Sequence, residues 1–303
     1  MAFELGWVLQ PTSRSRENTA GMIEANEAYM RALKPPFTTI WVEDHFQWED
    51  LPTLEVWTAM AYYAGAFPHL KVGSLTLGQS YRNPALTAKM AAMLQAQSGG
   101  RLILGIGAGW KEDEYLAYGY PYPSAGTRLA QLREAVEIMK LMWAESPASY
   151  QGKHYQIANA YCEPRHATPP TLMIGGGGER KTMRFAAELA DWWNIGFRPL
   201  PEYKAKVEIL HQHCADVGRD PSTLLLSYYG HVSVGRSEGE IERVDPVRPN
   251  IYRIAGTPEE VAAEINTYID FGVQHMMLKF SDYPALGQLE LFMGEVVPRL
   301  RLG

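Results

Sequence analysis

Three ionisable residues follow an apolar run in the segment TTIWVEDHFQW. Glu43, Asp44 and His45 stand directly after residues 37–42, which are β-branched and aromatic enough to predict a buried strand over 37–43. A histidine beside carboxylates can take or give a proton near neutral pH, while a carboxylate orients its ring. The pattern predicts His45 as a catalytic acid or base with Asp44 as its orienting group. The structural alternative is that Asp44 caps a loop and His45 is a half-buried ring.

A second candidate site is the glycine run in IGGGGERKTMRFAAELAD, residues 174–191. Four glycines leave a predicted strand and open a helix that carries Arg180 and Lys181 at its start, although a helix N-terminus favours acids. A bound anion would resolve this conflict, because backbone N–H groups and the positive helix end attract phosphate. We therefore expect Gly176, Gly177, Gly178 and Arg180 to bind phosphate. A flexible glycine loop with solvated charges is the alternative.

A third glycine pattern, GIGAGW, occupies residues 105–110 at the end of another predicted strand. Without side chains, backbone can approach a flat or anionic ligand closely. Glycines can equally pack a crowded barrel interior. A lone match of this kind is weak evidence for a dinucleotide site.

Eight short apolar segments that could position these residues alternate with stretches of helical period. The predicted strands are residues 3–9, 37–43, 70–76, 101–107, 171–175, 192–196, 224–234 and 273–280. Eight such units can close a (β/α)8 TIM barrel, whose chemistry lies at the C-terminal ends of the strands. A doubly wound open sheet is the alternative, but the glycine-rich turn expected after its first strand is missing. We predict an α/β fold, a TIM barrel in one domain over residues 1–303.

The sequence also predicts two helix starts and three insertions. Asn83 before Pro84, and Thr257 before Pro258 and Glu260, are typical N-caps. The long segments 108–127 and 146–170, the latter with a hairpin around 154–157, suggest lids or binding loops at the C-terminal face. The charged segment 236–250 is predicted to be exposed or mobile.

Composition narrows the class of protein. The chain has 303 residues, 28 Lys and Arg against 34 Asp and Glu, and a net charge of −6, without the basic stripe typical of nucleic-acid binding. The two cysteines, Cys162 and Cys214, form no CxxC pair, so neither a disulfide framework nor a metal site is predicted. No apolar run is long enough for a membrane span. We expect a cytoplasmic protein that binds neither nucleic acid nor membrane.

Several long motifs taken together resemble the bacterial luciferase-like flavin and deazaflavin oxidoreductases. The segments are WVEDHF, GSLTLGQSYRNPALTAKMAAMLQAQSGGRLILGIGAGWKEDEYLAYGYPYP, IGGGGERKTMRFAAELADWWN and, near the C-terminus, FGVQHMMLKFSDYP. The similarity extends along essentially the whole chain and is greatest to the group that uses the deazaflavin coenzyme F420. It implies an oxidoreductase that exchanges a hydride between coenzyme F420 and a small organic substrate. An FMN-dependent monooxygenase, supplied with reduced flavin by a partner reductase, is the main alternative, and a noncatalytic flavin-binding protein is another.

The resemblance also assigns residues. It implies that Asp44 and His45 border the coenzyme ring and substrate, and that Ser74 and Leu75 form a bulge with a cis peptide bond between them behind the ring. It further implies that Ala108, Gly109, Gly177 and Gly178 line the coenzyme tail and phosphate. As partners we expect a small-molecule substrate, a second copy of the chain in a homodimer and a flavin or deazaflavin reductase.

Overall fold

Eight parallel strands close a barrel in the computed structural model, which describes residues 2–12, 19–246 and 248–303. The expected (β/α)8 barrel is therefore confirmed, and the open-sheet alternative is wrong. All eight predicted strands form, with ends within two residues of the prediction. The barrel strands are β1 (Glu4–Val8), β2 (Phe37–Val42), β3 (Lys71–Ser74), β5 (Leu102–Gly107), β8 (Thr171–Gly175), β9 (Trp192–Gly196), β10 (Leu225–Val234) and β12 (His275–Phe280).

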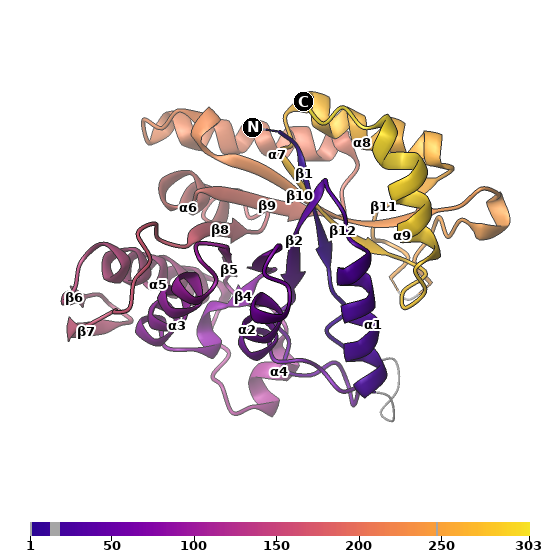
Figure 1. Cartoon of the computed structure of the whole chain (residues 1–303). Coiled ribbons are helices and arrows are strands. Elements are labelled where there is room, and N and C mark those ends of the chain that lie inside the picture. The colour runs from indigo at the N-terminus through magenta and orange to yellow at the C-terminus, as the bar shows by residue number, and fades with distance from the viewer. Residues whose placement is uncertain (1, 13–18, 247) are drawn as a thin grey trace.

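The strands follow one another round the barrel in chain order. Pairing of β12 with β1, for example Glu4 opposite His275, closes the ring. Because every pair in the barrel is parallel, the C-terminal ends of all eight strands meet at one rim. Figure 1 shows the two chain termini side by side at the opposite end of the molecule from the helix α4 (Glu112–Ala117).

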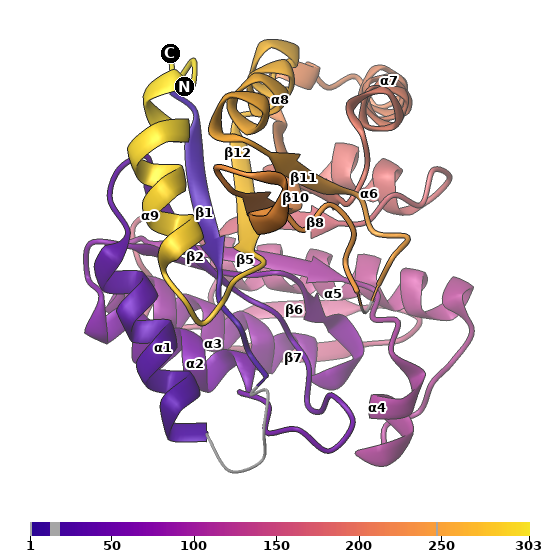
Figure 2. The same cartoon turned by 90° about the vertical axis from the view of Figure 1, so that its right-hand side faces the viewer.

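Helices cover the outside of the barrel (Figures 1 and 2). Besides α4 they are α1 (Thr19–Ala32), α2 (Val56–Ala66), α3 (Pro84–Gln97), α5 (Ala125–Ala144), α6 (Thr182–Leu189), α7 (Leu200–Asp216), α8 (Pro258–Phe271) and α9 (Gly287–Leu291). Short strands β4 (Leu77–Gly78) and β11 (Arg253–Gly256) pair with β5 and β10, while β6 (Ala148–Gln151) and β7 (Gln156–Ala160) form a separate hairpin.

The two predicted helix starts are confirmed. Asn83 Oδ1 accepts a hydrogen bond from the backbone N of Ala85 at 2.9 Å, and Pro84 occupies the first turn of α3. Thr257 and Glu260 form a reciprocal capping box at the start of α8. These caps satisfy backbone donors that a helix start leaves unpaired, so their sequence signal holds without tertiary information.

Trp41 fills part of the barrel interior. A Cβ added to Gly6 would lie 2.2 Å from Trp41 Nε1, and one added to Gly73 would lie 2.4 Å from its ring. The indole N–H donates to Nε2 of the buried His275 at 3.1 Å. Glycines are thus required at these two positions, where a side chain would collide with the indole.

The third predicted strand, residues 70–76, is interrupted. Leu75 still pairs with β2 through its backbone N, which donates to the carbonyl of Val42 at 2.8 Å, and the chain departs from the ladder one residue later. The non-prolyl cis bond joins Leu75 and Thr76, so the prediction of a cis bond between Ser74 and Leu75 is wrong by one position. Ser74 is held in the wall, where its Oγ donates to the carbonyl of Gly105 at 2.8 Å.

The insertion at residues 146–170 contains the predicted hairpin but does not reach the barrel mouth. It follows α5, and Glu134 of that helix accepts hydrogen bonds from the backbone N of Lys153, His154 and Tyr155 at 2.8 to 3.0 Å. The hairpin therefore packs on the outside of α5. Its expected role as a lid is wrong, because it connects a helix to the next strand rather than a strand to the next helix.

Candidate active site

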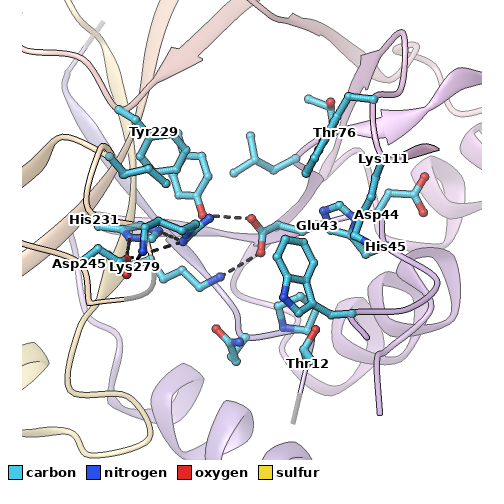
Figure 3. Close-up of a pocket in the computed structure, with 18 of the residues that line it drawn as sticks. Thr12, Glu43, Asp44, His45, Thr76, Lys111, Tyr229, His231, Asp245 and Lys279 are labelled. Atoms are coloured by element: carbon cyan, nitrogen blue, oxygen red, sulfur yellow. Dashed lines mark hydrogen bonds and ion pairs between the residues drawn. The ribbon is translucent and has the colours of Figure 1, made fainter. Parts of the chain in front are cut away.

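A cavity of about 1030 Å³ opens at the C-terminal rim of the barrel. Residues from the ends of several barrel strands and from two insertions line it. Among them are Glu43, Asp44, His45, Trp48, Leu75, Thr76, Ala108, Gly109, Trp110, Lys111, Glu114, Phe197, Tyr229, His231, Asp245, Arg248, Arg253 and Lys279. Figure 3 shows His45, Asp44 and Lys111 on one side and Tyr229, His231, Asp245 and Lys279 on the other, with Glu43 between them. This is the face where barrel enzymes place their chemistry.

His45 is oriented by a carboxylate from α4. Its Nδ1 lies 3.0 Å from Glu114 Oε1 and 3.2 Å from Oε2, and the Glu114 side chain is fully buried. Tyr81 donates its phenol to Glu114 Oε2 at 2.9 Å. Burial and the Glu114 charge raise the pKa of Tyr81, so the phenol remains a donor. With Nδ1 engaged by Glu114, Nε2 is the nitrogen of His45 left for a ligand.

Asp44 does not orient His45, and that prediction is wrong. Its carboxylate accepts two hydrogen bonds from Arg82, at 2.8 and 3.0 Å, and one from the backbone N of Gly78 at 2.9 Å. Arg82 also contacts Glu55 at 2.8 Å. Asp44 thus fixes the segment at β4 and also lines the cavity, but among the described residues it makes no hydrogen bond that caps the loop following it. Successive residues leave a strand in opposite directions, which separates Asp44 from its neighbour.

A charged pair lies at the centre of the cavity. Lys279 Nζ is 2.9 Å from Glu43 Oε2, and Tyr229 donates its phenol to Glu43 Oε1 at 3.1 Å. Burial by itself would raise the pKa of Glu43, but the Lys279 ammonium outweighs it and lowers that pKa to about 2. Burial, together with the Glu43 charge, raises the pKa of Tyr229 well above its usual range. Glu43 is therefore ionised and Tyr229 neutral across the physiological pH range.

The insertion at residues 236–250 forms one wall of the cavity. Most of its described residues are exposed, as expected, but Asp245 is buried at the cavity. Val247 of this insertion lies outside the described residues. Asp245 is buried and accepts from Arg253 Nη2 at 3.0 Å, with His231 Nδ1 at 3.5 Å. Burial, and next the positive charge of Lys279, lower the pKa of His231 to about 3, so this histidine is neutral.

The residues proposed to bind the coenzyme divide into two groups. Leu75, Ala108 and Gly109 line the cavity, and Gly109 has φ +74°, with the Tyr115 hydroxyl only 1.9 Å from where a Cβ would lie. Ser74 is buried in the barrel wall. Gly176, Gly177, Gly178 and Arg180 lie on the loop between β8 and α6 and are not among the residues that line the cavity. Arg180 is exposed at the start of α6, and Gly176 has φ +123°.

Sequence analysis did not identify the residues that contact Glu43 and His45 in the cavity. Tyr229 and His231 are internal to the long predicted strand, Lys279 is near the end of the last one, and Glu114 is one of three acids in KEDE. Their positions could have indicated them, because polar residues at the C-terminal ends of predicted strands converge on one rim. Which of the three acids in α4 turns inward depends on helix packing.

Comparison with known proteins agrees with this architecture. The luciferase-like monooxygenase family matches residues 3–251, which is most of the chain. The chain belongs to this family. The expected luciferase-like oxidoreductase is therefore confirmed.

The relatives include F420-dependent dehydrogenases and a monooxygenase. The F420-dependent glucose-6-phosphate dehydrogenase of Amycolatopsis mediterranei is 25% identical over 91% of this chain and 93% of its own. An F420-dependent secondary alcohol dehydrogenase, solved with an F420–acetone adduct, superposes with a TM-score of 0.83 at 20% identity over 99% of this chain and 100% of its own. EDTA monooxygenase from Chelativorans sp. BNC1 superposes with a TM-score of 0.80 at 18% identity over 98% and 93%. The two structural likenesses show the shared fold.

Among the described residues, no helix combines the length and apolar character that crossing a bilayer requires.

Proposed function

We propose that this member of the family is a coenzyme F420-dependent oxidoreductase that transfers a hydride between the deazaflavin and a small organic substrate. The observation that carries the proposal is the similarity to F420-dependent dehydrogenases over about nine-tenths of both chains. The cavity also fits such a group, since it offers an open volume of about 1030 Å³ beside backbone with few side chains at Ala108 and Gly109.

The coenzyme would lie between these backbone segments and Leu75. Leu75 belongs to an apolar cluster in the barrel interior together with Ile103, Met173 and Tyr229. An apolar floor suits a flat ring, and Phe197 and Trp110 would limit the access of water from the sides. When bound, the deazaflavin accepts or donates a hydride at one carbon of its ring, and the protein supplies orientation and electrostatics.

His45 would handle the proton that accompanies this transfer. Its Nε2 faces away from Glu114 and would accept a proton from a substrate hydroxyl, or return it to a carbonyl oxygen in the reverse direction. Glu114 is the positioning residue, since its contact with Nδ1 fixes the tautomer and the orientation of the ring. Trp48 and Trp110 stand edge-on to the imidazole, with ring centroids 5.2 and 5.9 Å from it, and hold its plane.

The identity of the coenzyme is directly testable. Purified protein is titrated with F420 and, separately, with FMN, and binding is followed by the change in coenzyme fluorescence. We expect F420 to bind at least about tenfold more tightly, a difference of roughly 1.4 kcal/mol. Tighter binding of FMN, with oxygen consumption when reduced FMN is supplied, would establish the monooxygenase alternative instead. The homodimer and the partner reductase stay predictions.

A further inference from the structure

Arg248, on the cavity wall formed by residues 236–250, carries a guanidinium whose contact with a carboxylate is loose. Its Nη2 is 3.9 Å from Asp245 Oδ2, and its side chain is 41% exposed. Asp245 is held more closely by Arg253, at 3.0 Å. The backbone N of Arg248 donates to Asp245 Oδ1 at 3.0 Å, which anchors the residue at the cavity edge. The backbone of Arg248 is thus fixed while its charged group is weakly paired.

The other cations that line the cavity, as far as the structure describes it, have close carboxylate partners. Lys279 is 2.9 Å from Glu43, Arg253 is 2.6 Å from Glu242, and Lys111 pairs with Asp113. Each of these charges is therefore largely offset within the protein. Arg248 differs from them because its contact with Asp245 is almost 1 Å longer and involves a carboxylate that Arg253 already binds.

A neutral group orients the guanidinium of Arg248. Its Nη2 lies 3.4 Å from Nε2 of His231, a ring that burial and the surrounding cations keep unprotonated. The imidazole nitrogen can accept a hydrogen bond but adds no negative charge. The guanidinium is therefore positioned at the cavity wall, 3.9 Å from the Asp245 carboxylate, where it can attract an anion.

We propose that Arg248 binds an anionic group of the substrate, a carboxylate or a phosphate, at the end of the cavity opposite His45. A guanidinium presents paired N–H donors that match two oxygens of either anion. Arg248 neighbours His231, and Figure 3 places His231 across the cavity from His45. The substrate would thus be an organic anion whose reacting carbon lies away from its charged group. The reaction itself rests on the proposed function, but anion binding does not require the coenzyme.

The test uses coenzyme-free protein and two probes, inorganic phosphate and succinate, titrated by calorimetry. Arg248→Gln removes the charge, Arg248→Lys keeps the charge without the fork, and Arg236→Gln is the matched control. Arg236 belongs to the same insertion but is exposed, pairs with Glu295 and does not line the cavity. We expect Arg248→Gln to weaken binding by ~10-fold to ~100-fold, Arg248→Lys by less, and Arg236→Gln not at all. Preference for one probe identifies the class of anion.

Two outcomes would overturn the proposal: no binding of either probe to the wild-type protein at about 10 mM, or unchanged binding in Arg248→Gln. Circular dichroism and thermal unfolding of each variant separate lost binding from lost fold. The F420 titration is independent, so a protein that binds anions through Arg248 but not F420 would contradict only the proposed function. A protein that binds F420 but shows no effect of Arg248 would contradict only this inference.

Discussion

The contact between His45 and Glu114 joins the end of β2 to a helix 69 positions later in the chain. Glu114 also accepts from Tyr81 and from the backbone N of Gln47, at 2.9 and 3.3 Å. Three donors directed at one buried carboxylate fix its position, and through it the position of the imidazole. A histidine held in this way keeps the orientation that proton transfer requires from one turnover to the next.

At the residue scale, we therefore predict different effects for His45 and Glu114. His45→Ala should lower turnover ~100-fold to ~10,000-fold while leaving coenzyme affinity nearly unchanged, because only the proton transfer is lost. Glu114→Gln should lower kcat less than His45→Ala and leave KM nearly unchanged, because the amide fixes the orientation of the imidazole less well while the rest of the cavity is unaltered. Steady-state kinetics from about pH 5 to about pH 9 measures both.

The control for this pair is Glu112→Gln, which changes an exposed acid in the first turn of the same helix. It should leave both turnover and the pH profile as in the wild type. Wild-type turnover in His45→Ala at every pH would mean that the ring has only a structural role. Wild-type kcat in Glu114→Gln would mean that Glu114 has no positioning role.

At the scale of elements, the loop between β8 and α6 is where backbone geometry and charge combine. Gly176 has φ +123°, which disfavours a side chain there, and a Cβ on Gly177 would lie 2.4 Å from Ile195 Cδ1, so the isoleucine would have to move. The Glu179 carboxylate forms an ion pair with Lys206, with Oε1 2.6 Å from Nζ. The loop therefore places glycine backbone beside the exposed Arg180, and its one acid, Glu179, is paired with Lys206.

Arg180→Ala is predicted to weaken binding of the phosphate-bearing coenzyme by ~10-fold or more, because a charge-assisted hydrogen bond contributes roughly 1.5–3 kcal/mol. Arg184→Ala serves as the control, since Arg184 lies in the first turn of α6, near Arg180 in the chain, but pairs with Glu188 at 2.8 Å. Fluorescence titration of the coenzyme compares the two variants. Equal affinities in wild type and Arg180→Ala would favour the alternative of a glycine loop with solvated charges.

At the scale of the whole molecule, closure of the barrel buries a histidine in its interior. His275 begins β12 beside β1, and its Nε2 accepts from the Trp41 indole at 3.1 Å. Its Nδ1 has no hydrogen-bond partner among the described residues. Burial, and next the charge of Lys71, lower the pKa of His275 to about 3 from an ordinary value of 6.5.

The sign of the pH effect follows from this pKa. The folded protein keeps His275 neutral, while the unfolded chain binds a proton below about pH 6.5, so stability falls as the pH drops from there toward 3. Between about pH 7 and about pH 5 this one residue should cost about 2 kcal/mol of unfolding free energy. His275→Gln keeps an acceptor for Trp41 but cannot be protonated, and should remove that part of the fall.

Urea unfolding at those two pH values measures this difference, with His69→Gln as the control because His69 is exposed. His231 is also neutral and buried, and it contributes equally to both proteins in the comparison. If His275→Gln lost as much stability between the two pH values as the wild type, then His275 would titrate normally in the fold.

Local sequence determined the elements. The eight strands, the caps at Asn83 and Thr257 and the hairpin after α5 depend on short-range patterns: apolar runs, side chains that satisfy backbone donors, and turn residues. The position of His45 at a strand end, and so its exposure to the cavity, follows from the same patterns because parallel strands share one rim.

Tertiary structure alone decided which charges meet. Asp44 and Glu114 are both carboxylates that could orient His45. The direction of the Asp44 side chain at the end of β2 makes it pair with Arg82, whereas the packing of α4 brings Glu114 to His45. Likewise, Glu43 meets Lys279 across 236 positions because β12 closes the ring next to β1. Ion pairs and hydrogen bonds act over a few ångströms, so they depend on how the strands and helices are brought together and not on sequence separation.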